Sequence, residues 1–404
     1  MSSPSSVRAR LSVFLRVFLA LAILGWIATT LPWKDELRWY TAKTDFESRV
    51  GEILEGDWKK DAIHFQVLEG GELGANWPAD AREAVQGGAA FEALRRAGET
   101  GFDWQPSMQR AFGDMDGGGL ATAMGLFVLA TIVVSTRWWR LLAVVGCHTS
   151  WFNALRLTYI GFCFNLVMPG MTGGDVIKGV IAAKENPGRR ADAVVSVIVD
   201  RVIGLLALAM LALVVIPLAG SGFDVLTRPL LLLLGGCLLG VFVYASRPLR
   251  KILRLNALAD RLPMADKLRS LDRAALLYLE HPVEVLIAMI LSVANHLIVC
   301  LGVYSLARAV GVDSAKAGAL DFIVLTCVAN LISAVPLAPG GWGVGEFAYK
   351  WLFEKIHLPG ALGVAVSVIF RLLTLVGLGL IGGVFLLLPG TRAEVRETRE
   401  GPGS

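Results

Sequence analysis

The sequence predicts an all-α polytopic membrane protein with about six spanning helices, two re-entrant hairpins in an inverted repeat and a small α/β extracytoplasmic insert. Three observations lead to this fold class. Hydrophobic residues make up 55% of the chain and charged residues only 18%. Several apolar runs are long enough to span a bilayer. Two more apolar regions are broken by Pro and Gly, and such breaks occur at membrane depth where backbone lines a cavity or is buried in protein.

The predicted spans lie in the long apolar runs, each of which matches the hydrocarbon core at a rise of about 1.5 Å per residue. The first run lacks the small-residue cleavage site of a signal peptide, so we expect residues 1–31 to be an uncleaved anchor. Residues 390–404 follow the last run as a tail. The runs cover residues 11–31, 118–136, 190–219, 229–246, 283–308 and 361–389.

The charge distribution predicts the orientation of the chain. Residues 32–117 carry ten Lys/Arg against seventeen Asp/Glu, whereas the whole chain has a formal net charge of +4. By the positive-inside rule we expect the basic segments and both termini to be cytoplasmic and the 32–117 insert to face outward. The expected location is the plasma membrane. The sides alternate correctly only if the broken regions 150–184 and 318–357 do not cross the membrane. Each must enter the membrane and leave it again on the same side, as a re-entrant hairpin. The basic segments are the N-terminus, Arg137 and Arg140, the stretch from Lys184 to Arg190, residues 247–273 and the tail.

The 32–117 insert has weaker signals. Two alternating segments, GEILEGDW and DAIHFQVLEG, predict a short hairpin around Trp58–Asp61. The stretch FDWQPSMQRAFGDM resembles an interfacial helix that leads into the second span. We find no catalytic pattern in the insert and expect a small cap over the membrane core.

An internal repeat relates the two broken regions. The first reads NLVMPGMTGGDVIKG from Asn165 and the second AVPLAPGGWGVGEFAYK from Ala334. Each has Pro-Gly, a further Gly, an acid and a Lys in that order, and each is followed by a related motif, VVSVIVDR or AVSVIFR. The copies, about 118–219 and 283–389, are expected to be inverted. Inverted repeats with broken helices are a transporter architecture, and the broken segments mark the binding site.

The glycine-rich breaks are candidate sites for an anion such as a lipid phosphate. Glycine permits close approach of a ligand, and the short helices that follow present N-terminal amides and the positive end of a dipole. The alternative is that the glycines only make turns and permit tight packing. Asp175 and Glu346 either complement the helix dipole or serve in proton coupling or headgroup-amine recognition. The glycines are Gly173, Gly174, Gly341 and Gly343.

Charges inside the spans are the other candidates. Asp200 and Arg201, within VVSVIVDRVIG, are costly at mid-membrane unless they are paired or hydrated. The repeat aligns Asp200 with Arg371, which predicts an ion pair and leaves Arg201 for the ligand, whereas a one-residue gap aligns Arg201 with Arg371. Guanidinium groups suit a phosphate clamp, with Lys178 as a weaker contact. The alternative is a structural ion pair in the bundle.

Other polar and aromatic residues predict structural roles. Asn165 and Asn330 are expected to hydrogen-bond the broken backbone. Five tryptophans are typical of an interfacial belt, namely Trp33, Trp138, Trp139, Trp151 and Trp351. The five cysteines are expected in the core rather than in disulfides. The five histidines have no metal-ligand spacing, so we expect no metal, no cofactor and no catalysis.

Three ordered motifs carry a family resemblance. At NLVMPGMTGGDVIKG, VSVIVDRVIGL and PLAPGGWGVGEFAY, over roughly residues 118–389, the chain resembles the lysylphosphatidylglycerol synthase transmembrane (flippase-like) family. Lys178 stands where members often have Arg. Founding members carry a C-terminal aminoacyl-transferase domain, whereas this chain ends soon after Pro389, so we expect no lipid lysylation. The resemblance places family motif positions at Asn165, Pro169, Gly173, Gly174, Asp175, Asp200, Arg201, Pro339, Gly340, Gly343, Glu346 and Arg371.

These observations predict translocation of a phosphate-bearing lipid, either a phospholipid or a polyprenyl-phosphate lipid, between membrane leaflets. The alternatives are a membrane-embedded enzyme of lipid or glycolipid assembly and a membrane scaffold. The expected partners are the lipid substrate and lipid-modifying enzymes. Nucleic acid is not expected, because the basic residues lie in short loops rather than on one face.

Overall fold

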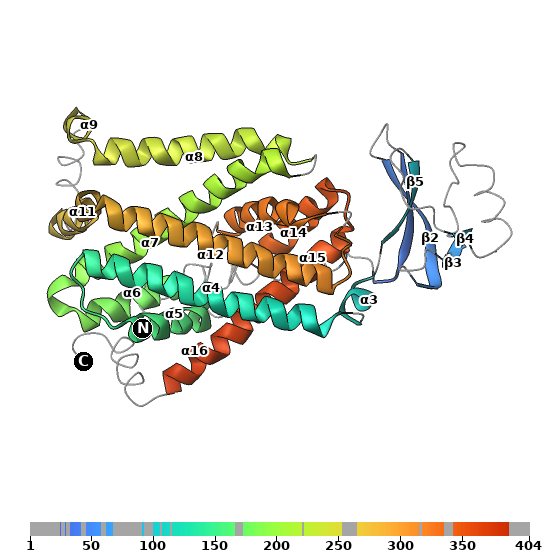
Figure 1. The fold of residues 1–404 in the computed structure, drawn as a ribbon, viewed down its shortest axis with the longest axis horizontal. Coiled ribbons are helices and arrows are strands. Elements are labelled where there is room, and N and C mark those ends of the chain that lie inside the picture. The colour runs from blue at the N-terminus through green and yellow to red at the C-terminus, as the bar shows by residue number, and fades with distance from the viewer. Residues whose placement is uncertain are drawn as a thin grey trace, which may run out of the picture.

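The computed structural model is a helical bundle with a β-sheet at one end (Figure 1). The predicted anchor over residues 1–31 and the tail over 390–404 lie outside the described residues, apart from two helical positions, Gly25 and Thr29. Beyond those two, the structure describes residues 33–41, 46–57, 62–67, 91–92, 100–105, 107–113, 115–165, 173–219, 222–252, 265–314, 317–334 and 342–387.

Within this described part, five helical segments are long and apolar enough to cross a membrane. They match five of the six predicted runs, so the protein is a multi-pass membrane protein whose spanning part is all-α. The segments are Gly117–Val144, Pro187–Leu218, Asp224–Ala245, Pro282–Ala309 and Gly360–Leu387.

The spanning helices form the long axis of the bundle. Helix α4 (Gly117–Val144) lies beside α12 (Pro282–Ala309), and α7 (Arg190–Val215) packs against both. Helix α8 (Asp224–Ala245) contacts mainly α7. The last span is one helix of three parts, in which α15 (Gly360–Arg371) and α16 (Leu378–Leu387) are joined by the π-helical turn η3 (Leu372–Gly377).

The two broken regions each contain a pair of short helices. In the first, α5 (Trp151–Asn165) is followed by α6 (Gly173–Glu185), and in the second, α13 (Ala319–Ser333) by α14 (Val344–Lys355). The two pairs lie at opposite ends of the bundle, the second at the end that carries the sheet (Figure 1). Their entry into the membrane as inverted hairpins stays a prediction.

The predicted second span ends too early. The run was expected to stop near residue 136, but α4 continues to Val144. The helix continues past the two arginines because the stretch after Ser135 is packed inside the bundle, where Arg137, Trp138, Leu141 and Leu142 are buried.

The insert contains a five-stranded antiparallel sheet in the order β4-β3-β2-β1-β5. The predicted hairpin is confirmed, because β2 (Phe46–Asp57) pairs with β3 (Ala62–Val67) and Asp57 lies opposite Ala62. The other strands are β1 (Glu36–Thr41), β4 (Phe91–Glu92) and β5 (Thr100–Gln105).

The interfacial helix predicted from FDWQPSMQRAFGDM is only half correct. Its first residues belong to β5, which pairs with β1, and only α3 (Met108–Gly113) is helical. The proline at position 106 separates the two, as expected for a residue that disfavours helix before it. An ion pair between Asp35 and Arg110 and a 2.6 Å hydrogen bond from the Ser107 amide to Asp35 Oδ1 join the base of the sheet to α3.

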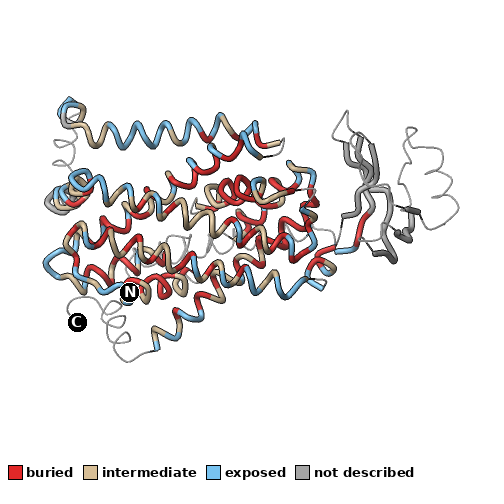
Figure 2. The backbone as a smooth tube through the Cα atoms, in the orientation of Figure 1, coloured by how far each residue is buried: buried red, intermediate tan, exposed pale blue. Residues whose placement is uncertain are grey.

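Two buried apolar clusters hold the bundle together (Figure 2). The larger contains Phe127, Phe322, Tyr349 and Phe353, and the smaller surrounds Trp138 where α4, α5, α6 and α7 meet. Most of α8 is exposed, as expected for a helix that faces lipid. The prediction that Cys237 lies in the core is therefore wrong, because this residue of α8 is exposed. All five cysteines are free, as predicted.

Candidate functional site

Asp200 lies on α7 at the centre of a buried set of charges. Its carboxylate oxygen Oδ1 accepts a 2.7 Å hydrogen bond from Nε of Arg137, and its Oδ2 is 3.8 Å from Nζ of Lys178. All three side chains are about 5% exposed, so solvent screens them little. The predicted pair between Asp200 and Arg371 is wrong, because both of the partners that Asp200 has belong to the first half of the chain.

Arg137 is the functional-site residue that the sequence analysis missed. The charge pattern predicts that it lies at the cytoplasmic end of a span, but it is buried on α4. It also donates a 2.7 Å hydrogen bond to Oγ of Ser292 on α12. It therefore ties three helices together. The signal was Asp200 itself: a buried carboxylate in a span requires a cation, and Arg137, at the end of an apolar run on another span, is a candidate besides Arg371.

Lys178 is buried on α6 between two acids and an aromatic ring. Its Nζ is 3.6 Å from Oδ1 of Asp175 and 4.1 Å from the ring centroid of Trp138, a cation–π arrangement. Trp138 donates from Nε1 to Oγ of Ser196 at 3.1 Å. The prediction that Trp138 belongs to an interfacial belt is wrong, because its ring is fully buried and forms one wall around Lys178.

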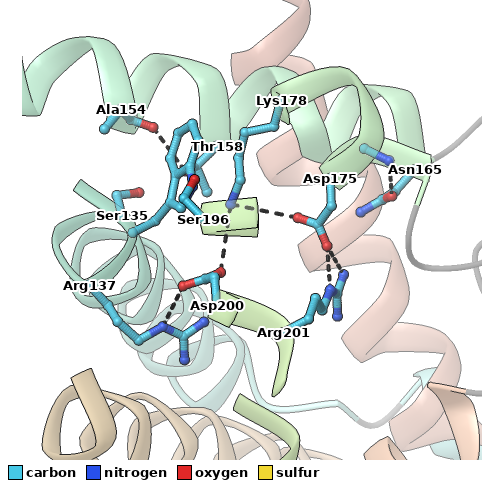
Figure 3. Close-up of polar contacts among 12 residues, drawn as sticks. Ser135, Arg137, Ala154, Thr158, Asn165, Asp175, Lys178, Ser196, Asp200 and Arg201 are labelled. Atoms are coloured by element: carbon cyan, nitrogen blue, oxygen red, sulfur yellow. Dashed lines mark hydrogen bonds and ion pairs between the residues drawn. The ribbon is translucent and has the colours of Figure 1, made fainter. Parts of the chain in front are cut away.

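Arg201 forms the open end of this set of charges. It pairs with Asp175 across the gap between α7 and α6 (Figure 3). Its side chain is 38% exposed, against 22% for Asp175. We call the series Arg137, Asp200, Lys178, Asp175 and Arg201 the charge chain. Its signs alternate from the buried end to the open end, and its three cations outnumber its two acids.

The second half of the protein has a related acid–base pair. Nε of Arg371 on α15 is 2.8 Å from Oε1 of Glu346 on α14, and the same oxygen accepts a 3.1 Å hydrogen bond from Oγ of Ser367. In each half, an acid near the start of a short helix pairs with an arginine on the next span. This matches the alignment of Arg201 with Arg371, the alternative that needs a one-residue gap.

Gly345 and Gly343 shape this second pair. A Cβ added at Gly345 would lie 1.8 Å from Nη2 of Arg371, so only glycine lets the guanidinium lie against the helix. Gly343 has a φ of 83°, which a side chain would strain. Its amide donates to Oε2 of Glu346 at 2.5 Å, so this glutamate caps its own helix.

The predicted glycines of the first broken region lie in close packing. Gly174 is buried against α5, and its amide donates a 2.7 Å hydrogen bond to Oδ1 of Asn165. This confirms the structural role predicted for Asn165. Close packing of α6 on α5 explains why residue 174 is a glycine. Gly173 is buried at the start of α6. In the second broken region, Gly341 lies outside the described residues.

A cavity of about 260 Å³ lies between the two halves of the bundle. One part of its wall is the charge chain, and Asn165 and Asn330 lie beside it. The rest comes from both halves and is mainly apolar, and we call the whole space the central cavity. Its other polar residues are Thr131, Thr158, Asn295, His296 and Thr374. Arg371 and Glu346 do not line it, so of the two predicted clamps only Arg201 faces this space. The apolar wall includes Phe127, Leu205, Leu208, Phe370, Leu375 and Leu378.

Comparison with known families gives the chain an identity at the family level. A family model described as the lysylphosphatidylglycerol synthase TM region matches residues 100–382, which is more than half of the chain. The chain belongs to this family. Membership in the lysylphosphatidylglycerol synthase TM family points to a role related to membrane lipids, and the matched residues include both halves of the central cavity. None of the curated proteins compared with the chain matches it.

Proposed function

We propose that this member of the family translocates an anionic, phosphate-bearing lipid between membrane leaflets. The observation that carries the proposal is the composition of the central cavity, which has charges with one cation in excess at one part and mainly apolar walls elsewhere. An anionic headgroup and its acyl chains need these two environments together. The plasma membrane, cytoplasmic termini and an inverted pair of hairpins belong to the same proposal.

Arg201 is the expected headgroup contact. It is the most exposed cation of the charge chain, and a guanidinium can bind phosphate through two parallel hydrogen bonds. A phosphate that binds Arg201 competes with Asp175 for it. Lys178, 3.6 Å from Asp175, then keeps this carboxylate compensated, so the exchange leaves no isolated charge. Asp200 and Arg137 hold the buried end of the chain in place.

The test is lipid movement in vesicles that contain the purified full-length protein. Fluorescent phosphatidylglycerol or phosphatidylcholine is placed in both leaflets, and a membrane-impermeant reductant reports the fraction that reaches the outer leaflet. We expect faster exchange of the anionic lipid than of the zwitterionic one, and loss of this exchange in Arg201→Gln. Arg228→Gln, at an exposed position on α8, is the matched control. Equal rates in empty and protein-containing vesicles would refute the proposal.

A further inference from the structure

A second hollow lies at the end of the bundle away from the sheet. It is a groove of about 820 Å³ between the turn that starts α7 and helix α11 (Ala265–Glu280). Ala183, residues 187–192 and Val194 form one wall, and Ser270, Leu271, Arg273 and Leu277 form the other. We call it the basic groove. It shares no lining residue with the central cavity.

The charges of the basic groove are unbalanced. Three arginines, Arg189, Arg190 and Arg273, line it together with a single acid, Asp192. Arg189 is already engaged, since its Nη1 donates to the carbonyl of Val145 at 2.8 Å and lies 3.6 Å from Asp192.

Arg190 and Arg273 are both exposed. Neither forms a salt bridge with an acid in the part of the chain that the structure describes. The groove therefore offers two guanidinium groups to an anion.

The position of the groove places it at headgroup depth. Its first wall is the beginning of the 187–218 span, where the apolar helix meets the membrane surface. Its second wall is amphipathic: Ala274 and Tyr278 of α11 are buried against the bundle, with Tyr278 donating to the Leu141 carbonyl at 2.9 Å, while Arg273 faces outward. A helix with this division of residues is typical of one that lies in the interface.

We infer that the basic groove binds the phosphate of an anionic phospholipid from the adjacent leaflet. The arginines bind the headgroup, and the apolar side chains of Leu271, Leu277 and Val194 contact the glycerol and the first part of the acyl chains. A membrane lipid reaches this depth without leaving the bilayer, and its apolar part can contact the apolar wall. A soluble anion has no apolar part to make that contact. The site is separate from the central cavity and does not depend on translocation.

Photo-cross-linking of the full-length protein in nanodiscs tests the inference. The probe is phosphatidylglycerol with a diazirine in its headgroup, added at low density to phosphatidylcholine, and mass spectrometry locates the cross-linked residues. We expect cross-links in 187–194 and 270–277. Arg190→Gln and Arg273→Gln should each lower the apparent affinity at these segments about fivefold, the contribution of one basic residue at an anionic surface. Both side chains are exposed, so folding is not expected to change.

Two controls separate this site from other binding. Arg228→Gln, an exposed arginine on α8 at the opposite end of the bundle, should leave the groove cross-links unchanged. So should Arg201→Gln in the central cavity, which makes failure of the groove distinguishable from failure of translocation. Inorganic phosphate at millimolar concentration should not displace the probe. Displacement by phosphate, or cross-links that persist when Arg190→Gln and Arg273→Gln are combined, would overturn the assignment.

Discussion

Asp200 has cations on two sides, Arg137 and Lys178. Removal of its charge leaves these two buried cations without the acid they share, and removal of Arg137 takes away the hydrogen-bonded partner of Asp200. We expect Asp200→Asn and Arg137→Gln each to destabilise the protein by about 3–5 kcal/mol, as for other broken buried ion pairs. The double variant should lose much less than the sum of the two. A double-mutant cycle of thermal unfolding in detergent measures this coupling.

The pair between Arg140 and Glu284 is the matched control for this cycle. It also involves α4, which it joins to α12 with two hydrogen bonds of 3.0 and 2.9 Å, but about a third of each side chain is exposed. Its loss should cost no more than about 1 kcal/mol. Additive losses for Asp200 and Arg137 would show that their contact is not energetically coupled.

Arg201 and Arg371 should differ in what they contribute. Arg371→Gln leaves Glu346 uncompensated at 1% exposure, so we expect a loss of about 3–5 kcal/mol in stability. Arg201→Gln disrupts a partly exposed pair, which costs about 1 kcal/mol or less. It should nevertheless slow transport about tenfold or more, because a hydrogen bond to a charged group contributes about 1.5–3 kcal/mol. Vesicle transport and thermal unfolding of both variants check this; equal destabilisation by the two would contradict it.

At the scale of elements, the contact between α5 and α6 fixes the position of Asp175 and Lys178. A Cβ at Gly174 would lie 2.0 Å from the carbonyl oxygen of Gly161, and neither backbone can yield without separating the helices. We expect Gly174→Ala to destabilise the protein by about 1–3 kcal/mol and to slow transport. Thermal unfolding and the vesicle assay measure the two effects.

Gly235→Ala is the control at the same scale. This glycine lies inside α8, and a Cβ added there would have no atom within 4 Å, so alanine should be neutral or stabilise the helix by up to about 1 kcal/mol. If Gly174→Ala is as well tolerated as Gly235→Ala, close packing of α5 on α6 does not position the charge chain.

At the scale of the whole molecule, the connections at the two ends of the bundle should face opposite sides of the membrane. A cysteine introduced at Gly188 should react with impermeant maleimide from the cytoplasm, and one at Ser314 only from outside. Both positions are exposed, at opposite ends of the bundle. Labelling of both from one side would refute the inverted topology.

The native cysteines set the background of this labelling experiment. Burial raises the pKa of the Cys147 thiol to about 11, with a smaller contribution from the nearby Asp192 carboxylate. Because the thiolate is the reactive form, Cys147 should stay unreactive at neutral pH and react only as the pH approaches its raised pKa. Cys237, exposed on α8, should be replaced by Ser before labelling.

The sequence by itself determined that this is a multi-pass membrane protein. It also determined the five spans among the described residues, the two broken regions and the β2–β3 hairpin. These follow from local properties, namely the length of apolar runs, Pro and Gly at breaks and alternation in strands. It also singled out Asp200 and Arg201, because a charge inside a span is conspicuous without any knowledge of its neighbours, and Asp175 and Lys178, because the second broken region repeats their pattern.

Only the tertiary structure decided which charges meet. Asp200 pairs with Arg137, 63 positions away, rather than with Arg371, and Trp138 turns inward to cover Lys178 rather than outward to the interface. A helix presents a different face every 100° or so, and which face meets which neighbour depends on how all the helices pack together. Hydropathy carries no information on that choice, so the pairing of the charges became visible only in the packed bundle.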